Sequence, residues 1–402
     1  MQSTCIIGGG PAGMMLGLLL ARAGLPVTVL EKHNDFFRDF RGDTTHPSTL
    51  QVMHELGLLP GLLRLPHTEL RRASAVVGGR TFPIADFTHL PVAAPFIALM
   101  PQWDLLNFLA ERAARYPTFQ LRMGHQATGL LYDSTGQVSG VTVRTANGEE
   151  SLRADLVVGC DGRHATSVTA AHLPVVETGV PIDVLWFRIP RQHDDPENGL
   201  GYVNFGHLVV LINRGGYFQV GFLIRKDGLP GLQQRGLPAF QQLLARIVPF
   251  LAGRVDSLHS WVDIKLLTVQ LNHLERWAVP GLLCIGDAAH AMSPVGGIGI
   301  NIAIQDAIAA ANRLVPALQR DAVTVHDLLS VQHYREATIR RTHGFQRLAH
   351  KVLNQILQAE GAMRPPLAIR VLTRLPGAQR LAGRLIGMGL QPQHVQTPEQ
   401  AF

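Results

Sequence analysis

The chain opens with a glycine-rich turn between an apolar run and a helical pattern. Residues 5–7 are Cys-Ile-Ile, and the next six are Gly-Gly-Gly-Pro-Ala-Gly, so Gly8, Gly10 and Gly13 have the spacing GxGxxG. A second apolar run at 27–30 follows the helical pattern, and this order predicts a β-α-β unit. Its glycines would permit a tight turn, a close approach of backbone to a pyrophosphate, and close packing of helix on strand.

The residues that flank this turn also fit a dinucleotide. Pro11 and Ala12 begin the helical pattern, where free backbone N–H groups and the helix dipole favour an anion. Glu31 ends the second apolar run and is placed to accept a hydrogen bond from a ribose hydroxyl. We include the adjacent Lys32 among the expected cofactor contacts. A chance turn would not combine these features, so we predict a nucleotide-binding site.

Composition indicates a cytoplasmic enzyme. The 402 residues are 46% hydrophobic, which is enough for a large core in two or three domains. Arginine supplies 32 of the 36 basic residues but is spread along the chain, and aromatic residues make up 6%, so nucleic-acid binding is not expected. No stretch of 18 residues is apolar and uncharged, so no transmembrane segment is expected.

Cysteine and histidine usage gives no metal site. Cys5, Cys160 and Cys284 form no CxxC pair and lie in apolar runs, which indicates buried thiols in a reducing compartment. The 18 histidines are scattered without ligand spacing.

Patterning along the chain predicts an α/β fold with a discontinuous Rossmann-like domain. Alternating helical and strand patterns give way after residue 175 to strands separated by turns, including a hairpin at Asn213-Arg214-Gly215-Gly216. A buried strand at 282–286 and an apolar helix at 300–314 then resume the first pattern. We expect Ser48 to cap a helix over 50–56. The predicted units are a nucleotide-binding domain (1–72, 97–175 and 265–330), a β-sheet substrate-binding insert (73–96 and 176–264) and a helical C-terminal region (331–402).

Two further motifs carry chemistry. Asp287 follows the apolar run 282–286, and a glycine-rich loop then leads into the helix that contains Asn301. A carboxylate at a strand end can bind a hydroxylated chain, and a glycine loop brings backbone N–H groups against a flat ligand. A second buried run, 156–160, ends in Asp161-Gly162.

Together the three stretches resemble the class A flavoprotein monooxygenases, the single-component aromatic hydroxylases of the p-hydroxybenzoate hydroxylase type. The resemblance covers residues 1–330 and implies bound FAD. On matching positions, Gly8, Gly10 and Gly13 would hold the pyrophosphate, Glu31 the adenosine ribose and Asp287 the ribityl chain. Asp161 would serve both FAD and NAD(P)H, and Gln102 would contact FAD. The residues beside the flavin ring would be Pro294, Gly297, Gly299, Ile300 and Asn301.

The resemblance also implies a reaction. It assigns Arg41, on the loop past which the flavin moves, and Pro294 to catalysis. NAD(P)H would reduce FAD, O2 would give a flavin C4a-hydroperoxide, and an aromatic or heteroaromatic small molecule would be hydroxylated. One departure from the family pattern is Ala165 and Val168, where a serine and an arginine are common. The last 70 residues resemble the helical tail of the shorter members.

The substrate is expected between the flavin and one alternating face of the insert strands. The aromatic candidates for this pocket are Trp186, Phe205, Phe218 and Phe222. Ordinary core packing is the alternative for each, and Phe218 and Phe222 share one strand face. His46 is either a base near the flavin or a helix-entry residue.

The sequence is also compatible with three other functions. A flavin halogenase would carry a Trp-x-Trp-x-Ile-Pro segment, of which 186–190 is a partial echo. A prenyl-lipid reductase would use FAD without oxygen. Arginines among leucines in the tail suggest a membrane-surface role, although a solvated helix face explains them more simply.

Overall fold

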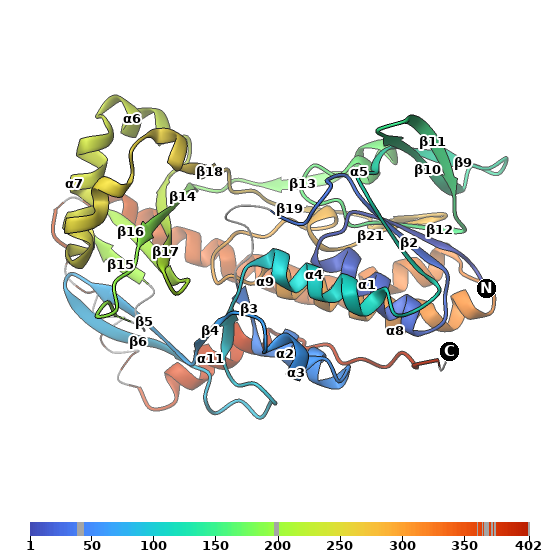
Figure 1. The fold of residues 1–402 in the computed structure, drawn as a ribbon, viewed down its shortest axis with the longest axis horizontal. Coiled ribbons are helices and arrows are strands. Elements are labelled where there is room, and N and C mark those ends of the chain that lie inside the picture. Colours follow the sequence, from blue (N-terminus) through green and yellow to red (C-terminus); the bar gives the residue numbers. More distant parts are fainter. Residues whose placement is uncertain are drawn as a thin grey trace.

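The computed structural model describes residues 1–37, 44–196, 201–359, 361–363, 365, 370, 373 and 375–400. Its main layer is a six-stranded sheet, parallel except at one edge (Figure 1). The strand order is β20 (Ala278–Val279), β21 (Leu282–Cys284), β12 (Leu156–Gly159), β1 (Thr4–Ile7), β2 (Val27–Glu31) and β8 (Phe119–Met123). The predicted Rossmann-like β-α-β unit is present, and the segments 1–31, 156–159 and 282–284 meet in one sheet.

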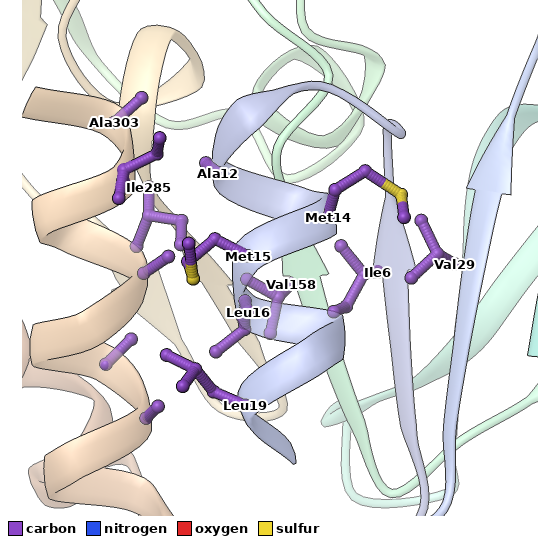
Figure 2. Packing of buried hydrophobic residues seen from close by; sticks show 14 of the residues in the cluster. Ile6, Ala12, Met14, Met15, Leu16, Leu19, Val29, Val158, Ile285 and Ala303 are labelled. Atoms are coloured by element: carbon purple, nitrogen blue, oxygen red, sulfur yellow. The ribbon is translucent and has the colours of Figure 1, made fainter. Parts of the chain in front are cut away.

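Three helices pack beside this sheet: α1 (Pro11–Arg22), α4 (Gln102–Ala113) and α8 (Gly299–Gln319). Helix α1 is buried nearly all round. Figure 2 shows Met15 and Leu19 of α1 pointing toward α8, and Met14 lying beside Ile6 and Val29 of the sheet. This arrangement requires a helix that is apolar on both faces, which the run 14–20 supplies.

A second, seven-stranded sheet is built mainly from the predicted insert segments, and we call it the cap sheet. Its order is β18 (Lys265–Leu267), β14 (Ile182–Pro190), β17 (Tyr217–Arg225), β16 (His207–Asn213), β15 (Gly201–Asn204), β5 (Arg72–Val77) and β6 (Arg80–Asp86). The parallel pairing of β15 with β5 joins the two separate insert segments. The sheet also takes in β18, so its last strand lies beyond the boundary that we placed at residue 264.

The hairpin predicted at 213–216 joins β16 and β17. Gly215 has φ of +77° and its N–H donates to Asn213 Oδ1 at 2.9 Å, so the turn depends on both residues. Helices α6 (Leu229–Gln234) and α7 (Leu237–Ile247), with the 3-10 segment η1 (Pro249–Ser257), cover one face of the cap sheet. Helix α7 ends at Ile247, and the chain continues as the 3-10 segment η1 from Pro249.

Smaller elements connect the two layers. Short sheets pair β3 (Thr44–Thr45), β7 (Ile97–Leu99) and β4 (Thr68–Leu70), pair β9 (Gln126–Tyr132), β10 (Val138–Thr145) and β11 (Gly148–Arg153), and pair β13 (Val175–Thr178) with β19 (Leu271–Leu274). The remaining helices are α2 (Pro47–Glu55), α3 (Leu59–Leu62), α5 (Thr166–Ala170), η2 (Trp261–Asp263), η3 (Gly286–Ala288), α9 (Val325–Gln358) and α11 (Ala378–Met388).

Several helix boundaries differ from expectation. Ser48 does not cap α2: the helix begins at Pro47, its N-cap is His46, and Ser48 is buried in the first turn. Helix α8 passes through Pro316 to Gln319 instead of ending near Leu314. Helix α9 starts at Val325, so it crosses the boundary that we drew at 330.

The C-terminal residues return to the N-terminal unit. After α11, residues 390–400 form an extended segment. Arg22 Nη1 donates to Thr397 O at 2.7 Å, and Gln400 N donates to Arg22 O at 2.9 Å. Glu55 accepts from Val395 N at 3.0 Å. The tail is therefore helical only in part.

Membrane-spanning helices, metal-ligand clusters and cysteines can be assessed in the part of the chain that the structure describes. Within this part no helix is long and apolar enough to cross a membrane, and no cluster of three metal-ligand side chains occurs. The three cysteines are free thiols, and burial raises the pKa of Cys5 and Cys284 to about 12, so neither is a thiolate at neutral pH.

Candidate active site

The predicted motifs meet at one edge of the main sheet. The last residues of β1, β12 and β21 are paired in register as Ile7, Gly159 and Cys284. The segments that follow them therefore start side by side at the carboxyl edge, where open α/β sheets bind ligands. Glu31 ends the neighbouring strand β2 at the same edge.

The three glycines of the first turn are required for different reasons. Gly8 has φ of +103°, and a Cβ there would lie 2.5 Å from Cys160 O. A Cβ on Gly13 would collide with the backbone oxygen of Gly8. A Cβ on Gly10, by contrast, would meet no atom within 4 Å. Gly8 and Gly13 shape the turn, whereas Gly10 leaves space in front of the helix.

That space lies at the N-terminus of α1, which no side chain caps and which has no acidic residue in its first turn. Glu31 is held beside it, because Oε2 accepts from Gly9 N at 3.1 Å and Oε1 from His33 N at 3.1 Å. Lys32 is exposed. Open space, an uncapped helix end and an oriented carboxylate fit the pyrophosphate and ribose of a dinucleotide.

Asp161 and Asp287 each have a side-chain partner whose role the sequence did not predict. Ser167 donates to Asp161 through its Oγ (2.7 Å) and its N–H (3.0 Å). Burial raises the pKa of Asp161, and these hydrogen bonds oppose the increase. Arg163 Nε pairs with Asp287 Oδ2 at 3.2 Å, so the turns after β12 and β21 are joined. Ser167, two residues after the position where the family often has serine, is the residue that contacts Asp161.

The glycine loop 293–299 lies across the start of α8. Gly297 has φ of +64°, and its carbonyl accepts from Thr44 Oγ1 at 2.8 Å. Asn301 is 3% exposed; its Oδ1 accepts from His46 N (2.9 Å) and from Thr49 Oγ1 (2.7 Å). Its amide nitrogen donates to Thr44 O and Gly297 O at 3.2 and 3.3 Å. Asn301 therefore fastens this loop to the start of α2.

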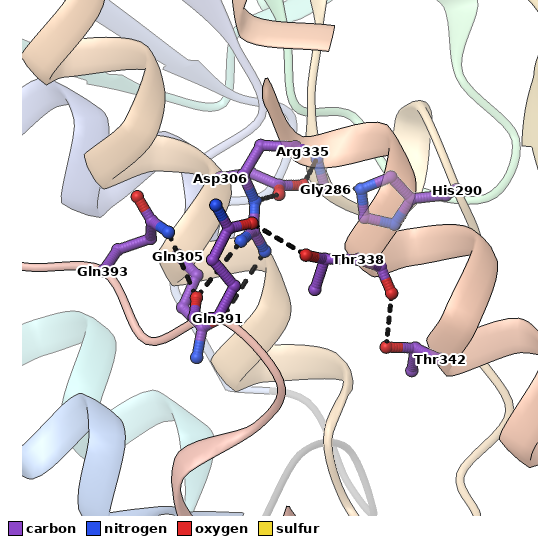
Figure 3. A network of polar contacts seen from close by, with 9 residues as sticks. All are labelled: Gly286, His290, Gln305, Asp306, Arg335, Thr338, Thr342, Gln391 and Gln393. Carbon is purple, nitrogen blue, oxygen red and sulfur yellow. Dashed lines mark hydrogen bonds and ion pairs between the residues drawn. The ribbon is translucent and has the colours of Figure 1, made fainter. Parts of the chain in front are cut away.

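A buried ionic network supports the preceding turn (Figure 3). Asp306 of α8 accepts from Gly286 N at 3.1 Å, contacts His290 Nε2 at 2.5 Å and pairs with Arg335 Nε at 2.8 Å. Burial raises the pKa of Asp306, but His290 and Arg335 outweigh it and hold the pKa below its usual value. The carboxylate is thus ionised, and it fixes Gly286 next to Asp287. A charged residue within the apolar helix 300–314 was the available sequence signal.

Helix α9 supports the glycine loop from the other side. Gln346 accepts from Ser293 N at 3.2 Å and donates to Ser293 O at 2.9 Å and Val295 O at 3.3 Å. His350 Nε2 lies 2.8 Å from Ser293 Oγ. Gln346 is fully buried and His350 nearly so. Pro294, between these contacts, is half-buried.

The two faces of the cap sheet have different roles. Phe218 and Phe222 pack into the core beneath α7 and η1, with Phe222 5.0 Å from Phe240 and Phe218 6.0 Å from Phe250. These two residues therefore face α7 and η1 and form ordinary core packing, which corrects their place among the pocket candidates. Phe205 borders the same core, with the Arg246 guanidinium 4.5 Å from its ring.

Trp186 lies on the opposite face, over Gly221, whose Cβ would come within 3.0 Å of the indole. Trp186 packs against two buried apolar clusters. One cluster contains Ile212 of β16, and Val295 of the glycine loop packs against the other. The loop 293–299 therefore packs, through Val295, against the cluster that Val184 and Leu223 of the cap sheet help to form.

Three predicted residues remain. Gln102 is the first residue of α4 and is half-buried. Arg41 lies within 38–43, outside the described residues. His46 is 1% exposed, its Nδ1–H donates to Ile386 O at 2.8 Å, and burial lowers its pKa to about 4. A neutral, buried N-cap residue agrees with the helix-entry interpretation.

Comparison with known proteins gives the family. Residues 1–342 match the model of the FAD binding domain. The chain is 33% identical to the 6-methylpretetramide 4-monooxygenase of Streptomyces rimosus over 98% of this chain and 94% of that protein. It is 31% identical to a rifampicin monooxygenase of Streptomyces venezuelae over 76% of this chain, which spans 62% of that protein.

The fold agrees. The crystal structure of pqsL, described as a probable FAD-dependent monooxygenase from Pseudomonas aeruginosa, superposes with a TM-score of 0.76 at 21% identity, covering 89% of this chain and 98% of that chain. The chain belongs to the FAD binding domain family and is a flavoprotein monooxygenase of the aromatic hydroxylase type.

Proposed function

We propose that this chain is an NAD(P)H- and O2-dependent hydroxylase of an aromatic or heteroaromatic small molecule. The observation that carries the proposal is that Trp186 of the cap sheet and Val295 of the glycine loop pack against the same buried apolar cluster, since this cluster joins the cap sheet to the loop beside which the flavin ring is expected. Similarity to proteins named for 6-methylpretetramide and rifampicin supports an aromatic substrate. The same relatives give no support to a prenyl-lipid reductase or a halogenase.

FAD, once reduced by NAD(P)H, would supply the activation of O2 from which one oxygen atom enters the substrate. The chain would contribute binding and orientation. The N-terminus of α1 beside Gly10 would hold the pyrophosphate, Glu31 the ribose and Asp287 the ribityl hydroxyls. The N-terminus of α8 after Gly297 would favour negative charge on the flavin ring.

The substrate would lie against the Trp186 face of the cap sheet. This face is apolar, through Val210 and Ile212, so it would exclude water from the reacting atoms. Pro294 and Gly299 would border the flavin on the opposite side. Arg41 stays a proposal from the resemblance alone. The chain shows one GxGxxG, so NAD(P)H would bind without a Rossmann unit of its own.

The deciding experiment is turnover under 18O2 with a screen of phenols, quinolones and polyketide aromatics. We expect substrate-stimulated NAD(P)H oxidation, with one labelled oxygen atom in the product and the other in water. A product formed at full rate without O2 would favour the reductase, and a chloride-dependent product would favour the halogenase.

Two variants test the residue assignments. Asp287→Ala should weaken FAD affinity roughly ten- to a hundredfold, since a hydrogen bond to a charged group contributes about 1.5–3 kcal/mol. Trp186→Ala should raise KM for the aromatic substrate, while Phe205→Leu, on the far side of the cap sheet, should not. Equal effects of the last two substitutions would contradict the proposed substrate face.

A further inference from the structure

The positive charge of the chain is concentrated near its C-terminus. Residues 337–398 contain nine of the 36 lysines and arginines but one of the 30 acidic residues, Glu360. The rest of the chain has 27 basic and 29 acidic residues, a net charge of −2. The net charge of +6 therefore comes entirely from this stretch. Anion binding at the Rossmann-like turn does not account for it.

Helix α11 lies within this basic stretch and is firmly seated on one side. A Cβ on Gly383 would collide with the backbone of Asp86 in β6, and one on Gly387 would lie 3.1 Å from side-chain atoms of Pro47 and Leu90. The carbonyl of Ile386 accepts the hydrogen bond from His46. In Figure 1, α11 lies beside α2, and Gly383 packs it against β6. Its glycine face is therefore fixed, and its opposite face points outward.

The outward face combines leucine with arginine. Arg380, Leu381, Arg384 and Leu385 share it through their i, i+4 spacing. Leu381 is 60% exposed and Leu385 44%, while both arginines are exposed. Leu375 before the helix and Leu390 after it are 49% and 48% exposed. Among the described carboxylates, none pairs with Arg380 or Arg384.

We propose that this α11 face binds the surface of an anionic phospholipid bilayer. Leucines that enter the acyl boundary beside arginines that reach phosphate groups are the pattern of a helix lying in the interfacial plane. A symmetric contact of this face with the same face of a second copy would bring Arg380 and Arg384 near the same arginines, which is repulsive. An acidic protein could pair with the arginines but would leave unexplained the exposed leucines that continue past both helix ends.

The test is co-sedimentation of the FAD-loaded protein with phosphatidylglycerol-containing vesicles and with phosphatidylcholine vesicles. We expect binding to the anionic vesicles that weakens as salt is raised, and little binding to the neutral ones. Arg380→Gln with Arg384→Gln should lower the affinity roughly thirtyfold, because each cation near an anionic surface contributes about a factor of five. Leu381→Glu should lower it roughly tenfold or more.

Leu348→Glu is the matched control. Leu348 is 61% exposed on α9, lies in the same basic stretch, and the substitution changes the charge identically. We expect this variant to bind like the wild type, with flavin content and circular dichroism confirming that every variant is folded.

Absence of wild-type binding at low salt would overturn the proposal. Equal losses in L381E and L348E would also overturn it, since binding would then follow charge alone. Light scattering could instead show a dimer that Leu381→Glu converts to a monomer. This result would overturn the proposal, because the α11 face would then bind a second copy of the chain.

Discussion

The turn at 8–13 and the segment at 286–301 lie at the same sheet edge, but they are held in different ways. The first depends on the absence of side chains, because Gly8 and Gly13 allow backbone to pack against backbone. The second depends on side chains supplied from far along the chain. Asp306 and Arg335 fix Gly286, and Gln346 fixes the loop after Ser293.

The two segments therefore depend on different interactions for their stability. The glycine turn is complete within its own sequence and leaves open space beside Gly10. The second segment contains polar groups that are worth little unless every partner is in place. We therefore expect substitutions in the supports of the second segment to cost more stability than most changes in the turn.

The largest effect is expected from Asp306→Ala. It leaves the guanidinium of Arg335 buried without its partner, which typically costs about 3–5 kcal/mol of unfolding free energy. Chemical denaturation of the FAD-free protein measures it. Glu336→Gln, which breaks the exposed pair with Arg340, should cost less than about 1 kcal/mol. Similar losses in both variants would mean that the buried network does not support the turn.

Gly13→Ala should be next, because its Cβ has no room against the backbone oxygen of Gly8. Overpacking of this kind costs about 1–3 kcal/mol and occasionally more. Gly344→Ala in α9 is the control: a Cβ there meets no atom within 4 Å, and the change should stabilise the helix by roughly 0.5–1 kcal/mol. A Gly13→Ala protein as stable as the wild type would refute the packing argument for the turn.

Acid should weaken the junction between the second segment and α2 through His46. Its pKa is lowered to about 4 in the folded protein, so the unfolded chain, with a pKa near 6.5, binds the proton first as pH falls. Stability is therefore lost between these values, by about 2 kcal/mol from pH 7 to pH 5 for this group. Urea titrations at both pH values should show a smaller loss in His46→Asn. An unchanged pH dependence would show that His46 does not bind its proton on unfolding.

The smallest effect on stability is expected from Gly10→Ala. The added methyl group enters open space, so the unfolding free energy of the FAD-free protein should change by less than about 0.5 kcal/mol. FAD affinity should nevertheless fall, since the methyl group occupies the approach to the pyrophosphate. Fluorescence titration separates the two quantities. Unchanged affinity would remove Gly10 from the cofactor site.

The comparison also explains what the sequence could predict. The spacing of Gly8, Gly10 and Gly13 predicts the turn from local sequence alone. The apolar runs around Ile7, Val158 and Leu283 predict the strands of the main sheet. The residues that support the second segment could not be predicted in this way, because Gln346 and His350 lie some 50 residues away on another helix. Hydrophobic periodicity also could not predict which face of the cap sheet is covered by helices. Alternation places Phe218 and Phe222 on one face, but only tertiary packing decides that α7 covers it.

The segment at 390–400 has a consequence for how the protein is made. Thr397 and Arg22 are 375 residues apart in the chain, so the contact at the end of α1 cannot form until residue 397 has left the ribosome. At roughly 5–20 residues per second, the nascent N-terminal unit waits on the order of 20–75 s for it. During that interval the first unit to be translated is the last to be finished.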